Sequence, residues 1–533
     1  MQSTNATDRK ILVIGIDGGT FDVIMPMIEA GLLPNLGKLV RNGIRSELLS
    51  TIPPVTSPAW SSFITGTNPG RHGVFGFFDR DLANYELNSV NTLMNLTNMK
   101  GIPFWRAFNR YGKKVGLINI PLTYPPDKVD GFMISGMLVP ENAKDYFHPA
   151  EIRSDLDGYQ VDLQGLRDNN NWNARNLVMA DRDGYIRKVF KMTESRAHHA
   201  LKFMKNKEWD FFMVVFTGSD RICHHFWTDN ETGEAPSPLV KKYYRFLDEK
   251  IGSLIEGSGE KTVKIMMSDH GFGKAPEKSI NAFALMKNLG YPAVGLNEKF
   301  RFLANKITQK MGLPRNKVEL DESYWRKSKV FPVPIYGNFL GISINTIGEK
   351  KWGIVQPGHE YESIIKEIIA QLETMKDPET GKNIATSIFR REDLYSGPHL
   401  TQSPDLTIQF SYDYQIVFRP LKKRIIERIK PARTGDHRRE GIFIAHGPNI
   451  PQALLSRPIE LADVTATLFA LLDIPCPASY EGRVIHEVMS NDFKEFARSN
   501  EFDNLSLEVD ARQGGTDEDF EKSKELLKNL GYM

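Results

Sequence analysis

The chain has 533 residues, of which 41% are hydrophobic and 25% are charged, as is usual for a soluble globular protein. Its 68 basic and 66 acidic residues leave a net charge of +2, which gives no electrostatic case for a nucleic-acid polymer or a membrane surface as a partner. Two cysteines cannot form a disulfide framework, and the sequence shows neither a signal sequence nor a transmembrane run, so we expect a cytoplasmic location.

Apolar runs along the chain predict buried strands, and helical patterns lie between them. The strands are expected at Lys10–Ile16, Val115–Ile120, Phe211–Thr217, Val263–Ser268, Leu406–Phe410 and Ile442–Ala445. The helical patterns include Phe104–Tyr111, Ala197–Lys205 and Tyr243–Ile255. This alternation predicts an α/β fold, a three-layer sandwich with a mostly parallel central sheet and helices on both faces.

Three stretches interrupt this alternation. Residues 79–100 are polar without strong periodicity, and residues 290–335 carry many basic and amphipathic helical positions, which suit an ordinary loop as well as a lid. After residue 490 the chain becomes polar and charged, as in a peripheral helix or a disordered tail. We expect one domain over residues 8–490, with insertions at about 79–100 and 290–335, and a charged C-terminal extension over 491–533.

An aspartate follows three of the expected strands. Asp17 comes after the first strand, Asp220 shortly after the third and Asp269 after the fourth. Ligands bind at the carboxyl ends of strands in a parallel sheet, so a single sheet brings these three carboxylates to one edge. For Asp17 alone, capping of the next helix is an equally good interpretation.

Histidines accompany two of these aspartates. His270 is adjacent to Asp269, and both side chains can reach one cation only where the chain bends, for which Gly271 and Gly273 are suited. His224 is four residues after Asp220, which places both on one face of a helix that begins near Ser219.

Two further residues, a histidine and a threonine, complete the set of residue types that a hydrolytic metal centre requires. His437 lies in a Gly-Asp-His segment, while His225 points away from the Asp220 side of its helix. Thr56 lies between prolines and before a helical pattern, where its hydroxyl is either a helix cap or a group next to a bound anion. Beside a metal ion this hydroxyl is able to ionise and attack phosphorus.

The segments that carry these residues resemble the alkaline phosphatase superfamily. They are most similar to its type I phosphodiesterase/nucleotide pyrophosphatase branch, and within it to the phosphohydrolase/phosphomutase-like proteins. The matching segments are Ile14–Asp22, Pro53–Phe77, Gly218–Trp227, Ser268–Gly273, Gly435–Pro448 and Ile459–Pro477. The resemblance covers most of residues 10–490 and implies an alkaline phosphatase-like catalytic domain.

The resemblance implies two divalent metal ions, zinc or else manganese. Its pattern assigns one ion to Asp17, Thr56, Asp269 and His270, and the other to Asp220, His224 and His437. A set of aspartates and histidines without a thiolate is compatible with either metal.

Thr56 occupies the position of the family's nucleophile, and its neighbour Ser57 is the alternative. Nucleotide pyrophosphatases carry a phosphate-binding asparagine downstream, where this chain has Phe77. Other groups must then bind the oxyanion, and the candidates are the Thr56 backbone N–H, Asn119, Arg221 and Arg438. We interpret His72 as structural and His446 as a packing residue or one that supports a ligand.

The sequence thus predicts a metal-dependent phosphohydrolase, a phosphodiesterase or phosphatase, that acts on a small phosphorylated substrate through a covalent threonine intermediate. A phosphomutase that uses the same site is the alternative, and a non-catalytic protein on this fold is another. The oligomeric state is not indicated by the sequence.

Overall fold

A computed structural model describes residues 9–87, 93–140, 142–163, 178, 181–291, 322–419, 422–489 and 497–506. The chain divides into two compact units. Unit 1 comprises residues 1–79, 90–274 and 432–533, and unit 2 comprises residues 80–89 and 275–431. Residues 292–321 of the expected 290–335 insertion and most of the expected C-terminal extension lie outside the described residues, so the domain scheme stays a prediction.

Unit 1 is built on a large sheet, which in the described part of the chain has ten strands. In spatial order these are β18 (Ala453–Leu454), β2 (Ile44–Leu49), β17 (Glu440–His446), β7 (Val263–Met267), β1 (Ile11–Ile16), β6 (Phe211–Phe216), β3 (Val115–Ile120), β4 (Gly131–Ser135) and β5 (Phe147–His148), with β19 (Ile459–Glu460) also paired to β2. The strands from β7 to β4 run parallel, which confirms the mostly parallel α/β sheet.

Two of the expected strands do not join the parallel centre. The strand expected at Ile442–Ala445 is β17, which is antiparallel to both of its neighbours, β2 and β7. The strand expected at Leu406–Phe410 is β13, which lies in unit 2 between two antiparallel partners. Its apolar side chains alternate with polar ones, a pattern typical of antiparallel sheets, whereas β1 at the centre of the large sheet has no polar side chain.

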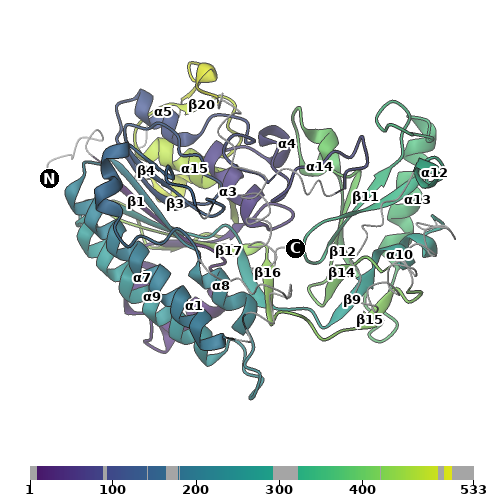
Figure 1. Cartoon of the computed structure of the whole chain (residues 1–533), viewed down its shortest axis with the longest axis horizontal. Coiled ribbons are helices and arrows are strands. Elements are labelled where there is room, and N and C mark those ends of the chain that lie inside the picture. The colour runs from purple at the N-terminus through teal and green to yellow at the C-terminus, as the bar shows by residue number, and fades with distance from the viewer. Residues whose placement is uncertain are drawn as a thin grey trace. The chain divides into compact units, whose positions relative to one another are not determined.

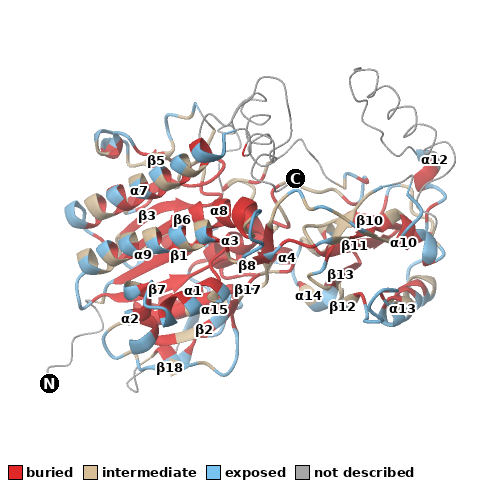
Figure 2. Cartoon of the chain, turned by 90° about the horizontal axis from the view of Figure 1, so that it is seen from below, coloured by how far each residue is buried: buried red, intermediate tan, exposed pale blue. Residues whose placement is uncertain are grey.

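Helices cover both faces of the large sheet, as Figure 1 shows. One face carries α1 (Phe21–Glu29), α2 (Pro34–Asn42), α7 (Arg182–Asn206), α8 (Gly218–Phe226) and α9 (Pro238–Ser258), and the other carries α3 (Thr56–Thr65), α4 (Pro69–His72), α5 (Phe104–Arg110) and α15 (Leu461–Leu471). Alternate side chains of β1 point to opposite faces, and Val13 joins Trp60 and Phe63 of α3 in the larger core. Figure 2 shows the central strands buried, while α7 and α9 expose their outer sides.

Unit 2 has a hydrophobic core of its own. An antiparallel sheet has the order β10 (Val330–Pro334), β11 (Phe339–Ile344), β13 and β12 (Ala385–Arg390), and a smaller sheet has the order β14 (Tyr414–Val417), β9 (Lys278–Asn281) and β15 (Ile426–Arg428). The helices are α10 (Ala282–Asn288), α12 (Glu322–Trp325), α13 (His359–Thr374) and α14 (Arg391–Leu394). The ring of Tyr85 stacks between Trp325 and Trp352, so residues 80–87 are anchored in this unit.

A two-stranded ladder in unit 1 joins the chain on either side of residues 275–431. It pairs β8 (Gly271–Lys274) with β16 (Gly435–Arg438) in antiparallel register, and His437 lies opposite Phe272. A Cβ atom at Gly271 would lie 1.9 Å from the carbonyl oxygen of Glu440. Gly271 is therefore required for close approach of two backbones, and it directly follows a bend at Asp269 and His270.

In the described residues no single helix is both long and apolar enough to cross a bilayer, and the pair α1 and α2, which satisfies length and composition together, is bent by 97°.

The N-terminus of α2 is capped from another helix. Leu33 at the N-cap position supplies no side-chain hydrogen bond. The carboxylate of Asp248, in α9, instead accepts hydrogen bonds from the backbone N–H groups of Asn35 at 3.1 Å and Leu36 at 2.8 Å. Because Asp248 is 1% exposed, these bonds join α2 to α9 in a buried environment.

We predict that Asp248→Ala lowers the free energy of unfolding by about 2 kcal/mol, because two buried N–H groups lose their acceptor. Thermal unfolding of the full chain measures the change. Glu249→Ala removes an exposed carboxylate from the same helix and is the matched control. Equal unfolding temperatures for the two variants would contradict the capping role.

Candidate metal centre

The seven metal-ligand candidates lie together in unit 1. They follow β1 and β7 or lie in α8, at the start of α3 and in β16, and all are at least 97% buried: Asp17, Thr56, Asp220, His224, Asp269, His270 and His437. Burial of so many ionisable groups is costly unless they bind one another or a cation.

Parallel pairing of adjacent strands brings the three carboxylates together. β1 is flanked by β6 and β7, and Asp17, Asp220 and Asp269 follow these three strands at their carboxyl ends. The hydroxyl of Ser219 donates to the backbone carbonyl of Asp17 at 2.6 Å. Gly18 has a left-handed φ of 67°, and its N–H donates to Asp269 Oδ1 at 3.2 Å, so the turn after β1 fixes the neighbouring carboxylate.

One group of ligand atoms comprises Asp220, His224 and His437. Asp220 and His224 lie one turn apart on α8, as expected, with His224 Nε2 at 3.2 Å from Asp220 Oδ1. His437 Nε2 lies 3.2 Å from the same oxygen and 3.0 Å from His224 Nε2. The ligand atoms of all three residues lie within 4.8 Å of one another.

A second group adjoins the first. Nε2 of His270 lies 3.6 Å from Asp17 Oδ1, 3.4 Å from Asp269 Oδ2 and 3.4 Å from the Thr56 hydroxyl oxygen. Asp220 also lies within 4.8 Å of the ligand atoms of Asp17 and His270, so it links the two groups. The rings of His270 and His437 stack with centroids 3.6 Å apart.

Backbone carbonyls determine the tautomers of two histidines. Nδ1 of His437 lies 2.8 Å from the carbonyl oxygen of Pro54, and Nδ1 of His270 lies 3.0 Å from that of Gly271. A carbonyl only accepts, so each Nδ1 carries a proton and Nε2 is the ring nitrogen that could bind a cation. Histidine ligands of metals are commonly oriented in this way.

The arrangement fits divalent cations. Asp17 Oδ1 and Asp269 Oδ2 are buried and receive no hydrogen bond, and the donor set contains oxygen and nitrogen but no thiolate. Burial, with the charges of Asp269 and Asp220, raises the pKa of Asp17 well above its usual range, and burial raises the pKa of Asp269 to about 8. Burial lowers the pKa of His224 to about 4, so this ring is neutral at physiological pH. A cation would relieve the repulsion among the carboxylates and would bind the neutral imidazoles.

The residues expected to bind the oxyanion differ in their surroundings. Arg221 is 1% exposed and is directed toward Asp220 Oδ2 at 3.2 Å and Asp162 Oδ2 at 3.0 Å. The guanidinium of Arg438 donates to the backbone carbonyls of His437, at 2.9 Å, and of Lys274. Asn119 is buried at the carboxyl end of β3, and its Oδ1 accepts no hydrogen bond. The assignment of these three residues to the substrate stays a prediction.

Other histidines singled out in the sequence lie apart from these groups. His225 packs edge-on against Tyr185. His72 accepts a hydrogen bond from the N–H of Val74 at 3.1 Å and lies 3.0 Å from the Ser62 hydroxyl, as a structural residue would. His446 pairs with Lys264, the second residue of β7, and therefore lies at the opposite edge of the sheet, which excludes support of a ligand.

The sequence analysis missed two charged residues at this site. Asp162 binds Arg221, and Nη1 of Arg433 lies 2.9 Å from His224 Nδ1. Arg433 was recognisable as a basic residue four positions before His437, whereas no local pattern marks Asp162.

Comparison with known proteins identifies the family of this chain. Residues 11–448 match the family model for type I phosphodiesterase/nucleotide pyrophosphatase. The chain belongs to the type I phosphodiesterase/nucleotide pyrophosphatase family. The resemblance seen in the sequence is thereby confirmed, and this member of the phosphodiesterase family is a phosphoric ester hydrolase.

A solved structure with a similar chain path is that of human ectonucleotide pyrophosphatase/phosphodiesterase 5. The similarity covers 91% of this phosphodiesterase-family chain and 100% of the human one, with a TM-score of 0.48 and 13% sequence identity. No curated protein matches the chain.

We predict that a divalent cation releases protons when it binds the metal-free protein. Below its raised pKa of about 8, Asp269 is protonated and must lose its proton to become a ligand. The apparent affinity should therefore rise from about pH 6 to pH 8 and then level off. Calorimetric titration with Zn²⁺ in two buffers of different ionisation enthalpy measures the released protons. Binding at pH 7 without proton release would contradict the prediction, and Asp269→Asn, which has no proton to lose at this position, should release fewer protons than the wild type.

Proposed function

We propose that this chain hydrolyses a small phosphorylated substrate at a two-metal site with Thr56 as the nucleophile. The observation that carries the proposal is the convergence of imidazole nitrogens and carboxylate oxygens within 4.8 Å of one another, with the Thr56 hydroxyl oxygen 3.4 Å from His270 Nε2. Family membership supports the hydrolysis of a phosphoric ester but leaves the nucleophile and the number of metal ions open.

The proposed ligand sets are those that the resemblance implied. Asp17, Thr56, Asp269 and His270 would hold one cation, and Asp220, His224 and His437 the other. When bound, the cations would lower the pKa of the Thr56 hydroxyl and neutralise charge on the phosphate and on the leaving oxygen. Zinc remains our first choice and manganese the second, and the cytoplasmic location remains part of the proposal.

Thr56 is well situated for an attack on phosphorus. It is the first residue of α3, so it lies at the positive end of the helix dipole, which favours an anion. Its hydroxyl gives up a proton and its oxygen forms a bond to phosphorus, while the bond from phosphorus to the leaving oxygen breaks and that oxygen takes up a proton to become an alcohol. Water then attacks the phosphothreonine from the side that the alcohol has left and returns Thr56 to its hydroxyl form. Two inversions give net retention at phosphorus.

We predict that Thr56→Ala lowers turnover of bis-p-nitrophenyl phosphate by about 10³-fold or more, because the covalent step is lost. Release of p-nitrophenol in the presence of Zn²⁺ or Mn²⁺ measures the rate. Thr56→Ser keeps a hydroxyl and should retain part of the activity, while Ser57→Ala should remain near the wild type. Near-wild-type turnover by Thr56→Ala would remove this residue as nucleophile.

We predict that the phosphoryl group leaves the protein with water and not with a second alcohol of the substrate. Mass spectrometry of products formed in H₂¹⁸O measures this outcome. Incorporation of ¹⁸O into the phosphorylated product is expected for a hydrolase, whereas an isomerised substrate without ¹⁸O would establish the phosphomutase alternative. Formation of neither product, together with the absence of bound metal, would favour a non-catalytic protein.

A further inference from the structure

The Arg221 guanidinium lies next to a proposed metal ligand and contacts two carboxylates. Arg221 follows Asp220 on α8 and is 1% exposed. The Nη1 atom of Arg221 contacts Oδ2 of Asp220 at 3.2 Å, whereas Oδ1 of Asp220 is the oxygen that faces His224 and His437. The two oxygens of this carboxylate therefore have different partners.

Asp162 shares the same guanidinium. The Nη2 atom of Arg221 donates a hydrogen bond to Asp162 Oδ2 at 3.0 Å, and Asp162 Oδ1 accepts one from the backbone N–H of Leu163 at 2.8 Å. The Asp162 side chain is 11% exposed, so the contact is largely shielded from water. A shielded ion pair is sensitive to the loss of either member, because the remaining charge is left without compensation.

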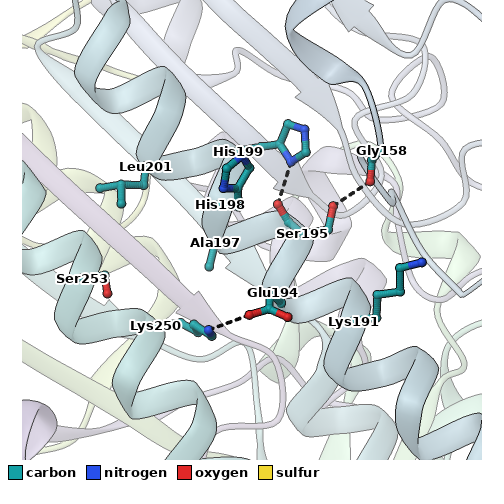
Figure 3. Close-up of a pocket in the computed structure, with 10 residues that line it drawn as sticks. All are labelled: Gly158, Lys191, Glu194, Ser195, Ala197, His198, His199, Leu201, Lys250 and Ser253. Carbon is teal, nitrogen blue, oxygen red and sulfur yellow. Dashed lines mark hydrogen bonds and ion pairs between the residues drawn. The ribbon is translucent and has the colours of Figure 1, made fainter.

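The α7 helix holds the backbone of residues 157–161, which lead to Asp162. Arg196 is fully buried, and its guanidinium donates to the carbonyl of Val161 at 2.7 Å and to that of Val215 in β6 at 3.0 Å. Ser195 donates to the carbonyl of Gly158 at 3.0 Å, a contact that Figure 3 shows at the rim of a pocket of about 490 Å³ along α7 and α9. None of the seven metal-ligand candidates lines this pocket.

We propose that Asp162 and Arg221 are positioning residues that keep the Asp220 carboxylate available to a divalent cation. Arg221 fixes Oδ2 of Asp220 and thereby directs Oδ1 toward the imidazoles. Asp162 binds the second amino group of the guanidinium and compensates the positive charge of Arg221. The negative charge of Asp220 therefore remains available to attract the cation. This inference rests on the proposed metal centre and assigns to Arg221 a role other than contact with substrate.

Loss of Asp162 should weaken the binding of metal. In Asp162→Asn the Arg221 guanidinium loses the charge of its second partner, and Asp220 then neutralises more of the positive charge of Arg221. We expect the Zn²⁺ affinity of the full chain, measured against a chromogenic chelator, to fall by about 10- to 100-fold, as for other residues that support metal ligands. Asp162→Glu restores the carboxylate and should recover most of the affinity.

A matched control and a double variant separate this role from a general effect on folding. Asp157→Asn removes an exposed carboxylate from the same segment and should leave the affinity unchanged. Arg221→Lys replaces a fork-shaped donor with a single ammonium group and should also weaken binding. If both residues act through one contact, the double variant should lose no more Zn²⁺ affinity than the single variant with the larger loss.

The visible absorption of bound Co²⁺ provides a readout that does not depend on turnover. We expect the bands to shift in Asp162→Asn and Arg221→Lys and to stay unchanged in Asp157→Asn. Wild-type affinity and bands in Asp162→Asn, or fully additive losses in the double variant, would overturn the positioning role while the proposed function stands. If the wild-type chain binds neither Zn²⁺ nor Co²⁺, the proposed metal centre itself fails. Should Asp162→Asn not fold, Asp162→Glu and Arg221→Lys decide the question by the same two measurements.

Discussion

Three carboxylates share one small buried region in this protein, and their mutual repulsion constrains everything around them. Asp17, Asp220 and Asp269 follow adjacent parallel strands, so the sheet itself enforces their proximity. Burial and this like charge raise the pKa of Asp17 and of Asp269. The raised pKa values favour the protonated forms of these two carboxyls, and a bound cation would favour their ionised forms. Arg221 contacts Asp220, whereas the neutral His224 and His270 supply no positive charge. The site is thus electrostatically incomplete without cations, which agrees with the ligand sets proposed for it.

The backbone contributes as much to this site as the side chains do. Carbonyl oxygens of Pro54 and Gly271 fix the protons of His437 and His270. The N–H of Gly18 orients Asp269, and the small size of Gly271 lets the chain at Glu440 approach closely. Such contacts depend on the path of the main chain, so the ligand geometry follows directly from correct folding of the sheet and not from a separate adjustment of each side chain.

Much of unit 1 was predictable from the sequence because its signals are local. Apolar runs predicted β1, β6 and β7. A residue that follows a strand in a parallel sheet lies where the carboxyl ends of the strands meet, so the position of the three aspartates could also be predicted. The spacing of Asp220 and His224 placed both on one helix face. Other features depend on contacts between residues far apart in the chain. The ion pair of Asp162 with Arg221 joins residues 59 positions apart, and β13 was assigned to the wrong sheet because an apolar run does not specify its partners.

The β8 and β16 ladder also determines how residues 275–431 leave and rejoin unit 1. Residues 275–431 leave the chain at the end of β8 and return just before β16, and Lys274 lies opposite Gly435 in the ladder. The two ends of a long excursion are thus held at the separation of neighbouring strands, the spacing that a hairpin turn also spans. Evolution can therefore lengthen, shorten or exchange this excursion while the strand that carries His437 keeps its register.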